Sequence, residues 1–264
     1  MRKFLQSFFT DATPPAPPAA LPAGERVYAV GDIHGRRDLF DALIKAIEHD
    51  DAKAGKADTT VILLGDLVDR GPDSAGVLRL ARKWQKHRKV RILAGNHEEM
   101  FLRSFKEKDV LRHFLRHGGK ETVLSYGVDK KEFTASSLKE VQELMKKHVP
   151  LKHIAFVEGF EDMIEAGDYL FVHAGIDPSR ALSEQKAKDL RWIREPFLSH
   201  GDPHERVVVH GHTITEAPED TGNRIGVDTG AYSSGCLTAL VLEGTERRYL
   251  STYADEDGKI RIRK

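Results

Sequence analysis

Five short polar segments contain the residue types that bind metal ions. They are GDIHGR (31–36), GDLVDRG (65–71), GNHEEM (95–100), HAG (173–175) and GHT (211–213). Together they supply two carboxylates, an amide oxygen and three imidazoles, which are too many ligands for one tetrahedral ion. They suit two five- or six-coordinate ions that share a carboxylate. Two ions about 3.5–4 Å apart can stabilise the attacking and leaving oxygens of phosphoryl transfer.

Each segment follows a stretch that predicts a β-strand. RVYAVGD (26–32), TVILLGD (60–66) and KVRILAGN (89–96) are mostly apolar runs, and each precedes a sequence with helical periodicity. This alternation predicts βαβ units and a parallel sheet covered on both faces. Ligands of open α/β sheets bind beyond the carboxyl ends of the strands, so the five segments are expected to meet there.

The remaining sequence divides into a helical and a strand-rich part. Residues 100–160 predict a helical insertion, with a break at Gly118-Gly119 and a capping box from Ser137 to Glu140. Strands return from residue 163 to residue 254, and their spacing predicts a mixed or antiparallel second sheet. We therefore expect residues 26–264 to form one catalytic domain, preceded by a tail and Pro/Ala linker over residues 1–25.

Composition excludes several classes of function. Lysine plus arginine and aspartate plus glutamate number 41 each, so no overall charge attracts nucleic acid or an anionic membrane. No apolar run reaches the roughly 18 residues of a membrane span. The single cysteine, Cys236, excludes an intramolecular disulfide and predicts a reducing, cytoplasmic location. It is expected to be a small buried side chain, with redox sensitivity as the alternative.

The N-terminal tail has two interpretations. TPPAPPAALPAG (13–24) predicts a polyproline-II linker, and the residues before it lack the features of a secretory signal. A disordered tail is favoured over a short helix that docks on the domain or on a partner.

The five segments resemble the signature blocks of the metallophosphoesterase (calcineurin-like) superfamily. Within it they are most similar to the phosphoprotein phosphatase branch, especially its bacterial and phage serine/threonine phosphatases. The resemblance covers about residues 26–245, and the insertion carries no signature. It implies an α/β fold with a two-sheet, mixed β-sandwich core flanked by helices. It also implies two divalent ions, with Mn²⁺ favoured and Fe, Zn, Ni or Co as alternatives.

The resemblance assigns the metal ligands residue by residue. One ion would be held by Asp32 and His34, and Asp66 would bridge to the other. The second ion would be held by Asn96, His173 and one histidine of the GHT segment. A bridging carboxylate offsets the repulsion between two cations, and neutral ligands preserve their Lewis acidity.

VVHGHTIT (208–215) offers two histidines for that last position. Related nucleases and cyclic phosphodiesterases usually carry Gly-His-x-His, in which both histidines bind metal. In that register the first histidine is His212 and the second position is Ile214, which cannot bind a cation. His212 is therefore expected to be the ligand and His210 to lie outside the metal shell. A single histidine favours phosphoprotein-type phosphatases over nucleases.

The resemblance also assigns the groups that contact substrate. Arg70 corresponds to the arginine that binds phosphoryl oxygens, and its guanidinium can contact two of them. His97 corresponds to the histidine that protonates the leaving alkoxide, and Asp69 orients it. His97 and Asn96 are both expected to border the substrate. The implied reaction is direct attack of a metal-bridging hydroxide on phosphorus, without a covalent phosphoenzyme.

A second phosphate-binding arginine is expected in LRWIREPFL (190–198). Alignment on Trp192 selects Arg194, with Arg191 as the alternative. The other interpretation is that this arginine is an exposed charge on an amphipathic segment, without a role in binding. Tyr232 in DTGAYSSG is either a substrate neighbour or a packed aromatic. His113 and His117 lie four residues apart on a predicted helix. They lack a carboxylate at matching spacing, so a second metal site there is not expected.

These assignments predict a serine/threonine protein phosphatase acting on a phosphorylated protein or small phosphoester. Two alternatives remain. Bacterial diadenosine tetraphosphatases share the fold and most segments, but LVDRGP and GNHEEM favour the phosphomonoester prediction. A non-catalytic phospho-binding module is the other alternative, and the presence of all six expected metal ligands argues against it.

Overall fold

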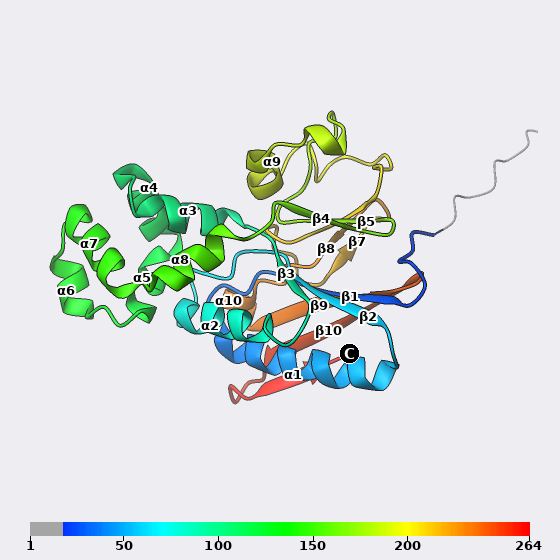
Figure 1. Ribbon diagram of the computed structural model, residues 1–264, viewed down its shortest axis with the longest axis horizontal. Coiled ribbons are helices and arrows are strands. Elements are labelled where there is room, and N and C mark those ends of the chain that lie inside the picture. Colours follow the sequence, from blue (N-terminus) through cyan, green and yellow to red (C-terminus); the bar gives the residue numbers. More distant parts are fainter. Residues whose placement is uncertain (1–17) are drawn as a thin grey trace, which may run out of the picture.

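Residues 18–264 are described by a computed structural model, and a six-stranded sheet forms one half of its core (Figure 1). The parallel strands β1 (Glu25–Val30), β2 (Asp58–Leu63) and β3 (Val90–Ile92) lie at one side. The antiparallel strands β9 (Cys236–Glu243), β10 (Glu246–Ala254) and β11 (Ile260–Arg263) complete it. The strand order is β11-β10-β9-β1-β2-β3.

A five-stranded mixed sheet forms the other half. Its strands are β4 (Met163–Ala166), β5 (Tyr169–Val172), β6 (Val207–His210), β7 (Glu219–Asp220) and β8 (Arg224–Gly226), in the order β4-β5-β6-β8-β7. β5, β6 and β8 run parallel, whereas β4 and β7 are antiparallel edge strands. The predicted α/β architecture with two sheets flanked by helices is confirmed.

One strand assignment was wrong. The segments at 236–244 and 247–254 were expected in the second sheet, but β9 pairs antiparallel with β1, with Tyr28 opposite Val241. The physical reason is burial: residues 237–242 of β9 are all buried. Such a strand needs cover on both faces, which the interior of the first sheet provides.

The side chains of β1 alternate between two hydrophobic cores. Val27 and Ala29 pack between the two sheets, whereas Tyr28 and Val30 pack on the opposite face. Helices α1 (Arg37–Ala54) and α2 (Ser74–Trp84) cover that opposite face (Figure 1). Burying each large apolar side chain there contributes roughly 1.5–3 kcal/mol. The site-bearing strand ends are therefore fixed from both sides.

A helical region follows β3 and extends to one side of the sheets (Figure 1). It contains α3 (Asn96–Ser104), α4 (Lys108–Phe114), the π-helical turn η1 (Leu115–Gly119), α5 (Lys120–Ser125), α6 (Lys130–Ala135), α7 (Leu138–His148) and α8 (Leu151–Glu158). The capping box is confirmed, because Ser137 Oγ and the Glu140 carboxylate each accept the other residue's backbone N–H. The predicted break is present at Gly118, whose φ is 103°.

Three short helical elements lie among the later strands. They are the 3-10 turn η2 (Leu182–Glu184), α9 (Ala187–Trp192) and α10 (Ala231–Ser234). No helix within residues 18–264 is long and apolar enough to cross a membrane. Most of the predicted tail, residues 1–17, lies outside the described residues. Immediately after it, Leu21 is buried and its N–H donates to Gly244 O at 2.9 Å.

Candidate metal centre

The Asp66 carboxylate lies at the centre of the predicted site. Asp66 follows β2, and its Oδ2 lies 3.6 Å from His34 Nε2 and 3.4 Å from His173 Nε2. His97 Nε2 is slightly farther away, at 3.9 Å. All four side chains are almost fully buried. A carboxylate with imidazole nitrogens on two sides has the position that a bridging ligand requires.

A second group of donors surrounds Asn96, the first residue of α3. Its Oδ1 lies 3.0 Å from both His173 Nε2 and His212 Nδ1. Asp32 lies beside this group, because its two carboxylate oxygens accept the His212 backbone N–H at 3.2 and 3.1 Å. The structure thus brings all six expected ligands into one cluster at the ends of β1, β2, β3, β5 and β6, and all of them except the half-buried His212 are buried.

Two of the histidines have a defined free nitrogen. The Nδ1 of His34 donates to Val68 O at 2.8 Å, and that of His173 donates to Leu64 O at 2.7 Å. A histidine fixed by a backbone carbonyl at one nitrogen presents the other as a ligand. Donor atoms of Asp66, His173 and His212 all lie within 4.8 Å of one another. These orientations fit the binding of divalent ions.

The electrostatic environment of these histidines differs. Burial lowers the pKa of His34 and of His212 to about 3, so both imidazoles are neutral and retain a lone pair. Burial also opposes charge on His173, but the Asp66 carboxylate outweighs it and raises the His173 pKa to about 10. Ligands must be deprotonated, so metal binding has to displace that proton.

Backbone strain is concentrated at the predicted site. In residues 18–264, five residues other than glycine have a positive φ: His34, Asp66, Asp69, Arg70 and His212. All five belong to the predicted site residues. A left-handed conformation costs an ordinary residue roughly 1–2 kcal/mol, and it persists only where the surroundings enforce it. This clustering supports the site independently of the side-chain distances.

Glu98 is one group that enforces the strained backbone. Its carboxylate accepts the backbone N–H groups of Gly95, Asp66 and Leu67 at 2.8–2.9 Å, and that of Val68 at 3.3 Å. The sequence analysis missed this role, although Glu98 lies in one of the quoted segments. The available signal was its position at N3 of the helix, where a glutamate closes a capping box.

The backbone N–H groups of Asp69 and Arg70 donate hydrogen bonds to residues of the helical region. Asp69 N–H donates to Thr122 Oγ1 at 2.8 Å and to Ser74 Oγ at 2.9 Å. Arg70 N–H donates to Gly118 O at 3.0 Å. The insertion, which carries no signature segment, therefore contacts the backbone of the site directly. No sequence pattern around Gly118 or Thr122 predicted these hydrogen bonds.

His97 and Asp69 form the predicted pair, with His97 Nδ1 donating to Asp69 Oδ2 at 2.6 Å. Burial opposes protonation of His97, but the carboxylates of Asp66 and Asp69 outweigh it and raise the His97 pKa. Arg70 lies on the other side of the ring. Its two terminal nitrogens lie 3.0 Å from the Nε2 atoms of His34 and His97. The Arg70 guanidinium, the His97 imidazole and the donor cluster thus converge.

The two candidate arginines near Trp192 have different environments. Arg191 donates to Asp162 Oδ1 at 2.6 Å and lies 3.5 Å from Glu99. Arg194 is exposed, and its side chain has no hydrogen-bond or ion-pair partner within residues 18–264. After burial and the charge of His173, the charge of Arg194 is among the influences that lower the His212 pKa. Within residues 18–264, Arg191 is therefore the paired arginine of the two and Arg194 the unpaired one.

Tyr232 and His210 also have defined positions. The Tyr232 ring meets that of His34 edge-on at 5.3 Å, so Tyr232 borders the cluster. His210 is buried, but its Nδ1 lies 3.0 Å from Gly211 O and its ring contacts Phe197. It is absent from both groups of clustered donor atoms in the described chain. The structure therefore brings His212, and not His210, into the cluster.

Comparison with known proteins identifies the class. The sequence profile of the family described as calcineurin-like phosphoesterase matches residues 25–231. The chain belongs to this family, as the sequence segments predicted, and is a phosphoesterase. The family uses a dinuclear metal centre, and the histidines and aspartates of the cluster are positioned for metal binding.

Similar proteins carry the names of different activities. The asymmetrical bis(5′-nucleosyl)-tetraphosphatase PrpE of Bacillus velezensis is 28% identical over 236 residues, covering 80% of this chain and 86% of its own. Serine/threonine-protein phosphatase 2 of Escherichia coli is 29% identical over 221 residues, covering 80% and 90%. The cold-active protein-tyrosine phosphatase of a Shewanella species shares the fold, with a TM-score of 0.55, 18% identity and coverage of 92% and 83%.

Proposed function

We propose that this protein is a phosphomonoesterase that acts on phosphoserine or phosphothreonine in proteins, in the cytoplasm. Asp32 and His34 would hold one ion, and Asn96, His173 and His212 the other, with Asp66 between them. When bound, two divalent ions supply Lewis acidity to the phosphoryl group and lower the pKa of a bound water. We propose Mn²⁺ as the ion that supports activity.

The side chains of the chain itself have separate roles in the proposal. Arg70 and Arg194 bind the non-bridging phosphoryl oxygens and neutralise their charge. His97 carries a proton on Nε2, and Asp69 stabilises that imidazolium through Nδ1. Arg70 can donate to Nε2 only while that nitrogen is unprotonated. A bound phosphoryl group would accept the Arg70 hydrogen bonds instead and leave Nε2 free to hold its proton.

The observation that supports a monoester substrate is the buried pair of His97 and Asp69, 2.6 Å apart. An alkoxide such as that of serine is a poor leaving group, and a positioned acid contributes roughly 10²–10⁴-fold to its departure. A nucleotide released from a polyphosphate is stabilised by its own phosphate and needs that proton less. The acid is therefore most useful for an alkyl phosphoester.

The decisive experiment compares two substrates on the purified, Mn²⁺-loaded protein. We expect release of phosphate from a phosphoserine peptide, and much slower cleavage of diadenosine tetraphosphate. His97→Asn should remove most peptide activity, whereas Lys45→Ala, an exposed change on α1, should leave it unchanged. Hydrolysis of the tetraphosphate alone would overturn the proposal.

A dinucleoside tetraphosphatase is the second candidate. The similarity to the Bacillus velezensis enzyme favours it, because that relative matches 236 residues at 28% identity, whereas the protein phosphatase matches 221 residues at 29% identity. The same metal cluster and arginines would serve either substrate. The two candidates differ in the leaving group, so the substrate comparison above separates them.

A further inference from the structure

Thr122 of α5 is completely buried against Asp69, although 53 residues separate them in the sequence. Its Oγ1 donates to Asp69 Oδ1 at 2.6 Å, and it accepts the Asp69 backbone N–H at 2.8 Å. Ser74 Oγ lies 2.9 Å from the same hydroxyl. One threonine hydroxyl therefore binds both the main chain and the side chain of Asp69.

The two oxygens of the Asp69 carboxylate have different partners. Oδ1 accepts from Thr122 and Oδ2 accepts from His97 Nδ1. His97 is the only basic side chain paired with Asp69 in the described chain, residues 18–264. Asp69 is 0% exposed, so water has no access to replace a lost partner. The rotation of the carboxylate about its Cβ–Cγ bond is set by these two hydrogen bonds.

We propose that Thr122 is a positioning residue for proton donation by His97. Its hydroxyl fixes the plane of the Asp69 carboxylate, which in turn fixes the His97 ring and directs Nε2 to the leaving oxygen. This inference rests on the proposed function, in which His97 is the acid. An oxygen derived from water forms a new bond to phosphorus as the bond between phosphorus and the leaving oxygen breaks. The electron pair of the broken bond remains on the leaving oxygen, and the Nε2 proton transfers to it.

Removing this hydroxyl has a specific chemical consequence. In Thr122→Val the shape of the side chain is retained, but Oδ1 of a buried carboxylate loses its side-chain donor. The carboxylate is then free to rotate, and the His97 ring loses its fixed direction. Positioning errors of this kind reduce acid catalysis without removing the acid. The effect should depend on how much the leaving group needs a proton.

The test uses the Mn²⁺-loaded full chain and two substrates. For a phosphoserine peptide, whose leaving group is an alkoxide, we expect Thr122→Val to lower kcat about 10- to 100-fold with little change in KM. For p-nitrophenyl phosphate, whose leaving group is already stable as an anion, we expect less than about a threefold change. Thr122→Ser retains the hydroxyl and should restore both activities.

A matched control separates positioning from stability. Thr252 is also 0% exposed, and its hydroxyl donates to Leu39 O at 3.0 Å, away from the cluster. Thr252→Val should lower the melting temperature to a similar degree and leave the ratio of the two activities unchanged. A spectroscopic readout, taken on the metal-free protein, is the proton on His97 Nδ1, whose NMR resonance should shift in Thr122→Val and keep its position in Thr122→Ser.

The outcomes distinguish this inference from the proposed function. Equal losses of activity on both substrates, or an unchanged Nδ1 resonance in Thr122→Val, would overturn the role of Thr122. If His97→Asn itself shows no dependence on the leaving group, the role of His97 as acid fails. If His97→Asn shows that dependence and Thr122→Val does not, only the positioning role fails.

Discussion

The guanidinium of Arg70 lies over the ring of Tyr232, with its Cζ 4.6 Å from the ring centroid. Tyr232 is 37% exposed, so this contact lies at the mouth of the cluster. An exposed cation–π contact is worth roughly 0.5–1 kcal/mol. Tyr232 is therefore suited to hold the direction of the arginine that is proposed to bind phosphate.

Tyr232→Ala should raise KM for p-nitrophenyl phosphate about two- to fivefold, because Arg70 loses the ring that orients it. Tyr232→Phe keeps the ring and should behave like the original protein. Tyr253→Ala removes a similar contact with Arg263, at 4.8 Å, and serves as the control in the same steady-state assay. Equal KM values for Tyr232→Ala and Tyr232→Phe would contradict this role.

Arg194→Ala should lower kcat/KM about 10- to 100-fold, the cost of one charge-assisted hydrogen bond of roughly 1.5–3 kcal/mol. Its melting temperature should not change, because the Arg194 side chain has no partner within residues 18–264. Arg191→Ala should show the opposite pattern, since it breaks the contact with Asp162. A larger loss of kcat/KM in Arg191→Ala would transfer the substrate role to that residue.

His212→Ala should weaken the binding of one of two Mn²⁺ ions, as measured by calorimetric titration. The loss should exceed the roughly 10- to 100-fold that follows removal of an outer partner of a metal site. His210→Ala should bind two ions with nearly unchanged affinity, although removal of a buried ring lowers its melting temperature. Loss of an ion in His210→Ala alone would show that the two histidines were assigned in the wrong order.

Gly118→Ala tests the contact between the helical region and the site. A Cβ there would lie 2.5 Å from Arg70 N and 2.6 Å from Arg70 Cγ, so Arg70 has to move. We expect kcat/KM to fall more than about tenfold and stability to fall by about 2–4 kcal/mol. The matched control is Gly127→Ala, which also has a positive φ but has nothing within 4 Å of the new Cβ. Similar activities in the two variants would refute the proposed contact.

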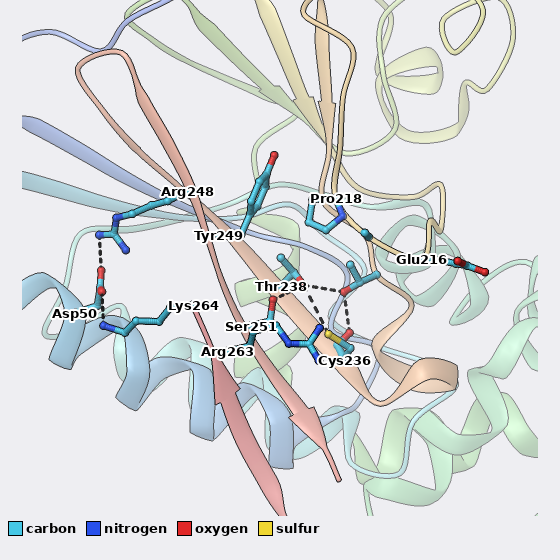
Figure 2. Close-up of a pocket in the computed structure, with 12 residues that line it drawn as sticks. Asp50, Glu216, Pro218, Cys236, Thr238, Arg248, Tyr249, Ser251, Arg263 and Lys264 are labelled. Atoms are coloured by element: carbon cyan, nitrogen blue, oxygen red, sulfur yellow. Dashed lines mark hydrogen bonds and ion pairs between the residues drawn. The ribbon is translucent and has the colours of Figure 1, made fainter. Parts of the chain in front are cut away.

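Asp50 should contribute to stability in a pH-dependent way. Burial raises its pKa, but hydrogen bonds from Arg248, Tyr28 and Lys264 outweigh burial and lower the pKa to about 2. Figure 2 shows the contacts with Arg248 and Lys264, and these three residues help to line a pocket that residues of β9, β10 and β11 and of the 216–218 segment complete. Because the folded pKa lies below the unfolded value of about 3.9, this stability is present above pH 4 or so. It is lost as the pH falls toward 2.

Asp50→Asn should therefore remove about 2 kcal/mol of stability at neutral pH and flatten the decline between pH 4 and pH 2. Urea unfolding at a series of pH values measures both effects. Asp41→Asn, in an exposed pair with Lys45 on the same helix, should change neither. If the stability of Asp50→Asn falls just as steeply between pH 4 and pH 2, other carboxylates are responsible for the pH dependence.

The sequence predicted the donors because they follow apolar strands directly. His34, Asp66 and Asn96 each lie within four residues of a strand end, and the carboxyl ends of β1, β2 and β3 share one edge. Strand order was harder to predict. Pairing of β9 with β1 joins residues more than 200 apart, and no local pattern specifies a partner at that distance.

The residues that hold the backbone of the site could not be predicted from the sequence either. Thr122 and Gly118 lie in a region without a signature, and their partners are set by how the helices pack. Glu98 was visible in a quoted segment, but its four backbone donors come from two loops whose approach depends on the assembled sheet. Residue type indicates which groups can do chemistry, whereas the hydrogen bonds that hold them depend on the tertiary structure.

The backbone N–H groups of residues 66–70 divide between two sources of support. Those of residues 66–68 are bound by Glu98 of α3. Those of residues 69 and 70 are bound by Thr122 of α5 and Gly118 of η1, with Ser74 of α2 also contacting residue 69. Amide exchange reports the opening of whichever element protects each proton. Deuterium uptake along five consecutive residues would thus report the opening of α3 at residues 66–68 and the opening of α5 and η1 at residues 69 and 70.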